Sequence, residues 1–207
     1  MITVLVATLN PGKQREYHDL LANLPVTWVG PADVGLDHLE VAEDGLTFEA
    51  NARLKALAFA RASGLPTLAD DSGLQVDALN GQPGVYSARY AGPAATDEDR
   101  YRKLLSVMAA IPDDRRSARF VCVVALALPD GEVHVAQGTL EGSIGRHPRG
   151  SGGFGYDPVF VLPDGRHLAE LSAMEKNAIS HRARALEALR PILLAVLERL
   201  QKSGAGW

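Results

Sequence analysis

The chain has 207 residues, and its 46% hydrophobic content excludes a largely disordered protein. Its 25 acidic and 21 basic residues give a formal charge of −4, which excludes a protein that coats duplex nucleic acid by neutralising phosphates. A single cysteine excludes a disulfide framework, and no apolar run is long enough to span a membrane. We expect one cytoplasmic α/β domain over 1–207 with a frayed tail at 203–207, and no nucleic-acid or membrane partner.

The first part of the chain is expected to alternate strands and helices. Residues 2–8 are a β-branched run typical of a buried strand, and Asn10 with Pro11 suits the start of a helix. A second helix is expected between Thr47 as N-cap and Gly64 as C-cap. The apolar residues 65–69 predict a short buried strand, with the sequence ADDSG at the point where it emerges.

The middle of the chain predicts one helix and then strands. A capping-box variant of Thr96 and Asp99 starts the helix, and Pro112 should stop it. Residues 118–128 and 132–140 predict a hairpin, with Cys122 as a buried structural thiol, and residues 158–162 predict another strand.

Two helices are expected near the end of the chain. Ser172 and Glu175 form a capping box for a short helix, and a last helix begins near Ser180. Pro191 should kink that last helix or leave a backbone bond unmade. These elements predict a mixed sheet flanked by helices.

Several stretches contain chemically capable residues, and each has an ordinary structural explanation. In ADDSG, the adjacent carboxylates of Asp70 and Asp71 repel each other, so a metal ion, a cation or water must offset their charge. The stretch ATLNPGK places a hydroxyl, an amide and a lysine at a helix N-terminus, which can bind a phosphate. Alternatively, Asn10 only caps the helix and Lys13 is solvated.

Two further stretches, SGGFGYDP and EKNAISHR, lie near the C-terminal end. The rings of Phe154 and Tyr156 either stack on a flat base or fold into the core. Lys176 precedes the expected helix break, whereas His181 and Arg182 follow it, where cations oppose the helix dipole at a small cost.

Acids and amides cluster at the start of the second helix. Glu43, Asp44 and Glu49 can simply complement the helix dipole. Asn51 and Lys55 lie one turn apart and can face the same side.

Six motifs occur in one order along the chain: ATLNPGK, EDGLTFEANARLKA, LADDSGLQVDALNGQPGVYSARYAG, RFVCVVAL, GSGGFGYDPVF and AELSAMEKNAISHRARAL. This series resembles the inosine/xanthosine triphosphate pyrophosphatase family. The resemblance implies hydrolysis of ITP, dITP and XTP to the monophosphate and pyrophosphate, with Mg²⁺ as cofactor. It also implies an elongated α/β fold with two lobes around a central nucleotide-binding cleft, and a homodimer.

The resemblance also implies roles for individual residues. Asp71 would be the catalytic base and a metal ligand, with Glu43 as a further ligand, and Asp70 would either bind the metal or hold a residue that does. The residues implied to bind the substrate are Thr8, Leu9, Asn10, Pro11, Gly12, Lys13, Lys55, Ser72, Phe154, Gly155, Tyr156, Asp157, Lys176, His181 and Arg182.

The sequence departs from the family pattern at two positions. Ala50 stands where relatives carry an acid before Asn51, which leaves Glu49 as a possible substitute, and Leu9 stands where a smaller or polar residue is common. Two other functions are compatible with the motifs: a pyrophosphatase for other modified nucleotides, and a catalytically silent nucleotide-binding module.

Overall fold

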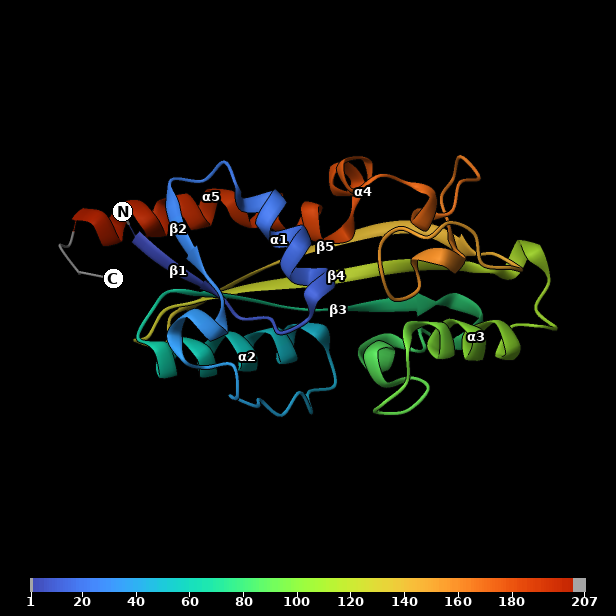
Figure 1. Cartoon of the computed structure of the whole chain (residues 1–207), viewed down its shortest axis with the longest axis horizontal. Coiled ribbons are helices and arrows are strands. Elements are labelled where there is room, and N and C mark those ends of the chain that lie inside the picture. Colours follow the sequence, from blue (N-terminus) through green and yellow to red (C-terminus); the bar gives the residue numbers. More distant parts are fainter. Residues whose placement is uncertain (1, 203–207) are drawn as a thin grey trace. The chain divides into compact units, whose positions relative to one another are not determined.

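The computed structural model describes residues 2–202, so the tail at 203–207 lies outside the described residues. Six strands form a sheet in the order β2-β1-β3-β4-β5-β6 (Figure 1). β1 (Ile2–Val6) pairs in parallel with β2 (Val26–Val29) and β3 (Thr67–Val76), whereas β5 (Val133–Ile144) is antiparallel to β6 (Phe160–Val161). β4 (Ser117–Ala127) lies between β3 and β5. The predicted mixed α/β class is therefore confirmed.

The chain divides into two compact units. Of the described residues, unit 1 contains 2–71, 122–138 and 182–202, and unit 2 contains 72–121 and 139–181. Each of the long strands β3, β4 and β5 supplies residues to both units.

Unit 1 packs helices on both faces of its strands. α1 (Pro11–Leu21) and α5 (His181–Lys202) lie on one face, and α2 (Phe48–Ser63) lies on the other (Figure 1). A 3₁₀ turn, Pro31–Val34, follows β2. The core between the strands, α1 and α5 is apolar and includes Val4, Leu21, Leu68, Val124, Leu189 and Leu193.

Unit 2 holds α3 (Asp97–Val107) and α4 (Ala173–Ile179), which lie on opposite sides of its strands (Figure 1). Its apolar core includes Leu74, Leu104, Met108, Phe120, Ile144 and Phe160. Short 3₁₀ turns at 77–79, 84–89, 113–115, 157–159 and 168–170 connect these elements.

The predicted helix caps are confirmed. The side chains of Asn10, Thr47, Thr96 and Ser172 each accept a bond from the backbone N–H three residues ahead, and Gly64 ends α2 in the left-handed conformation. Each cap satisfies a backbone N–H group that the first helical turn leaves without an intrahelical partner.

Three predicted boundaries were wrong. α3 ends at Val107 rather than at Pro112, and the Arg116 guanidinium binds the carbonyls of Met108 and Ile111 beyond its end. β6 has two residues because 157–159 form a 3₁₀ turn containing Pro158, which has no N–H for a sheet. β3 does not stop before ADDSG but includes it.

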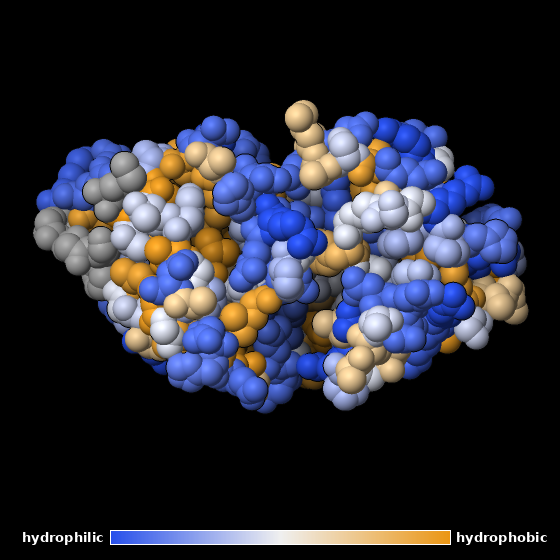
Figure 2. Space-filling view, viewed as in Figure 1, coloured by the Kyte–Doolittle hydropathy of each residue, from blue (hydrophilic) through white to orange (hydrophobic). Residues whose placement is uncertain are grey.

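The surface mixes polar and apolar residues on the face shown in Figure 2. Large apolar side chains that are more than half exposed include Leu9 at 52%, Leu46 at 85% and Met174 at 83%. No helix within residues 2–202 is both long and apolar enough to cross a membrane.

Candidate active site

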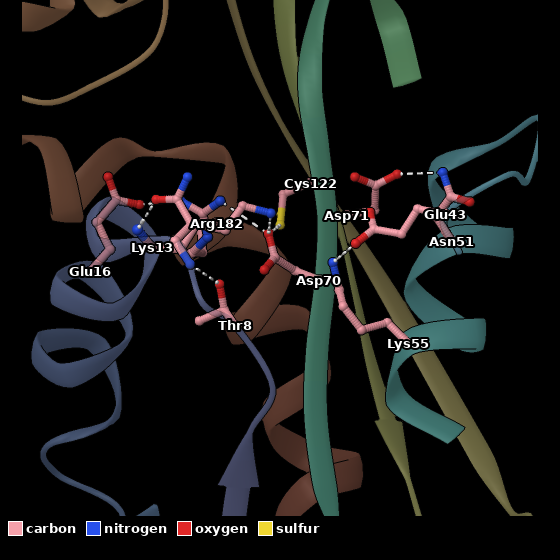
Figure 3. Close-up of polar contacts among 11 residues, drawn as sticks. Thr8, Lys13, Glu16, Glu43, Asn51, Lys55, Asp70, Asp71, Cys122 and Arg182 are labelled. Atoms are coloured by element: carbon pink, nitrogen blue, oxygen red, sulfur yellow. Dashed lines mark hydrogen bonds and ion pairs between the residues drawn. The ribbon is translucent and has the colours of Figure 1, made fainter. Parts of the chain in front are cut away.

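The aspartates of ADDSG lie inside β3 and point to opposite sides of it. Successive side chains of a strand alternate between its two faces, so Asp70 points toward α1 and α5 while Asp71 points toward α2 (Figure 3). The repulsion between the two carboxylates is therefore reduced because they lie on opposite sides of the strand. Each carboxylate then has its own set of partners.

Asp70 is fully buried and paired with two cations. Its Oδ2 lies 3.0 Å from Lys13 Nζ and 3.0 Å from Arg182 Nη2. Burial alone would raise the pKa of Asp70, but the charges of Lys13 and Arg182 outweigh it and hold that pKa far below its usual range. The Cys122 thiol is 3.7 Å from the same oxygen, and burial raises its pKa strongly, so the predicted structural thiol is confirmed.

The segment 8–13 turns from β1 into α1. The Thr8 hydroxyl accepts a bond from the Asn10 N–H at 3.3 Å, and the Asn10 side chain accepts one from the Lys13 N–H at 3.0 Å. Thr8 and Gly12 are buried, whereas the Leu9 side chain faces solvent. Lys13 is not a solvated lysine, because its side chain is 14% exposed and bound to Asp70.

Arg182 connects Asp70 to α1. Its guanidinium is completely buried, forms an ion pair with Glu16 through Nη1, and lies 5.7 Å from the centre of the Tyr17 ring. The structure thus places this guanidinium on two carboxylates of unit 1, and contact between Arg182 and a base stays a prediction.

Asp71 is held by an amide on α2. Asn51 Nδ2 donates a bond of 2.9 Å to Asp71 Oδ2, and Asn51 Oδ1 accepts one of 2.8 Å from the Gly45 N–H. Burial raises the pKa of Asp71, and the charge of Glu43 raises it further, while the bond from Asn51 and the charge of Lys13 lower it. The net effect is a pKa of Asp71 above its ordinary value.

Glu43 lies beside Asp71 and pairs with Lys55. Lys55 Nζ is 2.6 Å from Glu43 Oε1, and Figure 3 shows the Glu43 and Asp71 carboxylates on the same side of β3. Glu49 forms an exposed pair with Arg53 at 2.8 Å, and its substitution for the acid absent at Ala50 stays a prediction. Among residues 2–202, no group of three or more His, Cys, Asp or Glu side chains can hold a metal ion.

In unit 2, three of the predicted base-binding residues contact one another: Phe154, Asp157 and Lys176. Buried Lys176 pairs with buried Asp157 and lies 4.5 Å from the centre of the Phe154 ring. The Phe154 N–H donates to Asp157 Oδ2 at 2.9 Å. Gly153 has a φ of +71°, and a Cβ there would lie 1.9 Å from the same oxygen, so this position requires glycine.

The two rings of SGGFGYDP behave differently. Tyr156 is 4% exposed, belongs to the unit 2 core, and donates its hydroxyl to the Ser87 carbonyl at 2.9 Å. Phe154 is half-buried beside Lys176. The core interpretation therefore holds for Tyr156, whereas Phe154 is only partly buried.

The remaining predicted residues of unit 2 are Gly155, His181 and Ser72. Gly155 donates its N–H to Asp97 Oδ2 at 2.7 Å. His181 is buried and stacks on Phe120, with ring centres 4.9 Å apart and planes 13° from parallel. Ser72 follows Asp71 in β3 and is half-buried.

The sequence-based site omitted Glu16 and Asn51, which connect its charged groups in unit 1. A signal existed for both, because Glu16 is three residues after Lys13 in α1 and Asn51 is four residues before Lys55 in α2. What the spacing could not show was which partner each side chain would meet.

Fold and site together define a mixed α/β protein with a carboxylate and lysine cluster beside a helix N-terminus. Residues 4–192 match the Ham1 family, so the chain belongs to that family.

Relatives cover almost the whole chain. The dITP/XTP pyrophosphatase of Symbiobacterium thermophilum is 51% identical over 195 residues, which cover 94% of this chain and 96% of that protein. The dITP/XTP pyrophosphatase of Escherichia coli K12 is 49% identical over 192 residues, which cover 91% and 96%. The structure of a HAM1 protein from Coxiella burnetii has a TM-score of 0.85 at 44% identity and covers 94% of this chain and 100% of that one.

Proposed function

We propose that this protein hydrolyses ITP, dITP and XTP to the monophosphate and pyrophosphate, which removes non-standard purines from the nucleotide pool. The observation that carries the proposal is the pairing of Asp71, a buried carboxylate with a raised pKa, with Glu43 beside it. Relatives named dITP/XTP pyrophosphatase at 49% and 51% identity support it.

The triphosphate is assigned to segment 8–13. Backbone N–H groups at the start of α1 attract anions, and Lys13 adds a positive charge that Asp70 keeps in place. In this proposal Thr8, Leu9, Asn10, Pro11 and Gly12 contribute mainly backbone groups, so an exposed apolar side chain at Leu9 is tolerated.

Mg²⁺ is the proposed cofactor, with Glu43 and Asp71 as its protein ligands. Mg²⁺ in phosphoryl-transfer sites takes one or two carboxylates and fills its remaining positions with waters and substrate phosphates, which fits a pair of carboxylates better than a larger cage. Asp70 faces Lys13 and Arg182 on the other side of β3, so we assign it to positioning those cations. When bound, Mg²⁺ would neutralise phosphate charge and acidify a water.

Asp71 accepts the proton of the attacking water in the proposed reaction. The water oxygen bonds to phosphorus as the bond between the α- and β-phosphates breaks, and pyrophosphate leaves. Lys13 and Lys55 offset the charge that develops on the phosphate oxygens. Asn51 holds the carboxylate of Asp71 while the proton moves.

The base and the rest of the nucleotide are assigned to unit 2. Phe154 offers a ring for stacking, and Lys176, His181 and Ser72 offer donors, while Gly155 is assigned to the loop that carries the ring and gives its own N–H to Asp97. Hypoxanthine and xanthine carry a 6-keto acceptor where adenine carries an amino donor, so donors favour the keto bases. We propose that buried Asp157 and Tyr156 hold these base-binding residues in place, Asp157 through its pair with Lys176 and Tyr156 through its bond to the Ser87 carbonyl.

A substrate panel tests the proposal. With Mg²⁺, the protein should release pyrophosphate from ITP and XTP far faster than from ATP, and Asp71→Asn should lower the rate by about 10²–10⁴-fold, as the loss of a general base does. Release of orthophosphate alone, or equal rates for all three nucleotides, would contradict it. Faster cleavage of pyrimidine or methylated nucleotides would favour a different substrate class, and ITP binding without hydrolysis would favour a silent binding module.

We propose a homodimer on the family resemblance, and a cytoplasmic location stays an expectation drawn from the sequence. Sedimentation velocity should give twice the mass of one chain, and a single species with the mass of one chain would exclude the dimer.

A further inference from the structure

The Asn51 amide connects two parts of unit 1 that carry the proposed carboxylates. It is 1% exposed and bonds to the Gly45 N–H on one side and to Asp71 on the other. A backbone N–H can only donate, so the amide oxygen must face Gly45 and the amide nitrogen must face Asp71. The hydrogen bonds therefore fix the orientation of this side chain.

Gly45 reaches Asn51 only because it has no side chain. A Cβ at this position would lie 2.6 Å from Asn51 Oδ1 and 2.8 Å from Ala50 Cβ, both closer than real Cβ contacts. At Gly30, also in unit 1, a Cβ would meet nothing nearer than Asp33 Oδ2 at 3.6 Å. The two glycines thus make a matched pair, of which only Gly45 is sterically constrained.

The same segment is attached to α2 a second time. Glu43 stands two residues before Gly45 and pairs with Lys55, one turn after Asn51, at 2.6 Å. Both contacts come from one face of α2, and Asn51 is the member that also reaches Asp71.

We propose that Asn51 and Gly45 form a latch, defined by the bonds from Gly45 to Asn51 and from Asn51 to Asp71, that sets the position of Glu43 relative to Asp71. Asn51 is then a positioning residue for the reaction. This inference rests on the proposed function and goes beyond it, because neither residue contacts the proposed phosphate segment through any bond described above.

Breaking the latch should change kcat but not KM. Loosening it misplaces the two carboxylates but leaves segment 8–13 intact, so kcat should fall while KM for ITP stays within about twofold. A displacement of about 1 Å can cost about 100-fold in rate, and a loss of this order is expected for Asn51→Leu and for Gly45→Ala. Because both changes disrupt the same pair of hydrogen bonds, the kcat of the double variant should be no lower than that of the slower single variant.

The experiment measures two quantities on Asn51→Leu, Gly45→Ala, their combination and the control Gly30→Ala. Steady-state kinetics with ITP and Mg²⁺ give kcat and KM. Hydrogen exchange of the Gly45 amide, without metal or nucleotide, should be at least tenfold faster in Asn51→Leu than in the wild type. Gly30→Ala should match the wild type in both quantities.

Unchanged kcat, an unchanged exchange rate, or losses that multiply in the double variant would overturn the latch. Failure of the wild type to release pyrophosphate would instead overturn the proposed function, and slow Gly45 exchange in that protein would still support the contact. If Asn51→Leu does not fold, the kinetics of Gly45→Ala test the latch instead. That variant keeps the Asn51 side chain, and its added methyl group only pushes the amide away from residue 45.

Discussion

At the scale of residues, two neighbouring aspartates have opposite electrostatic surroundings. Asp70 lies between Lys13 and Arg182, which hold its pKa well below the ordinary range, whereas burial raises the pKa of Asp71. The difference follows from the alternation of side chains along β3, since one residue faces cations and the next faces an amide and a second acid. The charged form of Asp70 is thereby stabilised, whereas the charged form of Asp71 is destabilised by its burial.

Arg182→Met should strongly destabilise the protein. The change leaves Glu16 and Asp70 buried with less compensating charge, and removing one member of a buried ion pair costs about 3–5 kcal/mol. Arg199→Met, also in α5, is the control: it removes an ion pair with Glu132, and the Arg199 side chain is 54% exposed. The loss of this exposed pair should lower the free energy of unfolding by less than about 1 kcal/mol. Urea unfolding measures both, and equal losses would refute a special role for the buried network.

The stability contributed by Asp70 should disappear in acid. Its pKa is lower in the folded protein than the ordinary value of about 3.9, so the unfolded chain binds the proton first. This contribution is present above about pH 4 and is lost as the pH falls below it. The unfolding free energy of Asp70→Asn should therefore decline less steeply than that of the wild type between about pH 5 and pH 3, and identical slopes would count against this assignment.

At the scale of elements, local signals set where helices begin, and tertiary contacts set where some of them end. Thr47 and Gly64 bound α2 as their side-chain and backbone chemistry predicts. α3 ends early where buried Arg116 takes up carbonyls beyond its last turn. The bond from Arg116 to the Met108 carbonyl joins residues eight apart in the chain, and the pattern of apolar residues cannot predict it.

The final helix keeps an exposed proline in its interior. α5 continues through Pro191, which has no N–H to donate to the preceding turn. Pro191→Ala should therefore raise the unfolding free energy, by up to about 3 kcal/mol, whereas Arg190→Ala beside it should change stability by less than about 0.5 kcal/mol. Urea unfolding of both variants checks this, and a loss of stability in Pro191→Ala would show that the proline fits its site.

At the scale of the whole molecule, the chain crosses between the two units several times. β3, β4 and β5 each run from one unit into the other, so neither unit is a continuous piece of sequence. Cooperative unfolding is the expected consequence, because disordering a strand in one unit removes structure from the other.

Thermal unfolding should show a single transition. Leu5→Ala in unit 1 and Leu74→Ala in unit 2 both replace side chains with 0% exposure, and each should cost about 2–5 kcal/mol. For a chain of this size, each kilocalorie lowers the midpoint by about 2–4 °C, so both variants should shift the same transition downward by several degrees. Two resolved transitions, each moved by only one variant, would contradict this expectation in calorimetry.

The sequence by itself determined the mixed α/β class, the helix caps, the buried thiol of Cys122 and the family motifs, because periodicity, capping chemistry and motif order are local properties of the chain. Only the tertiary structure decided that β3 runs through ADDSG, that Asp70 meets Lys13 and Arg182, and that Asn51 joins Gly45 to Asp71. These contacts join residues from different elements, and the energy of a buried charge depends on which partners the fold brings within a few ångströms.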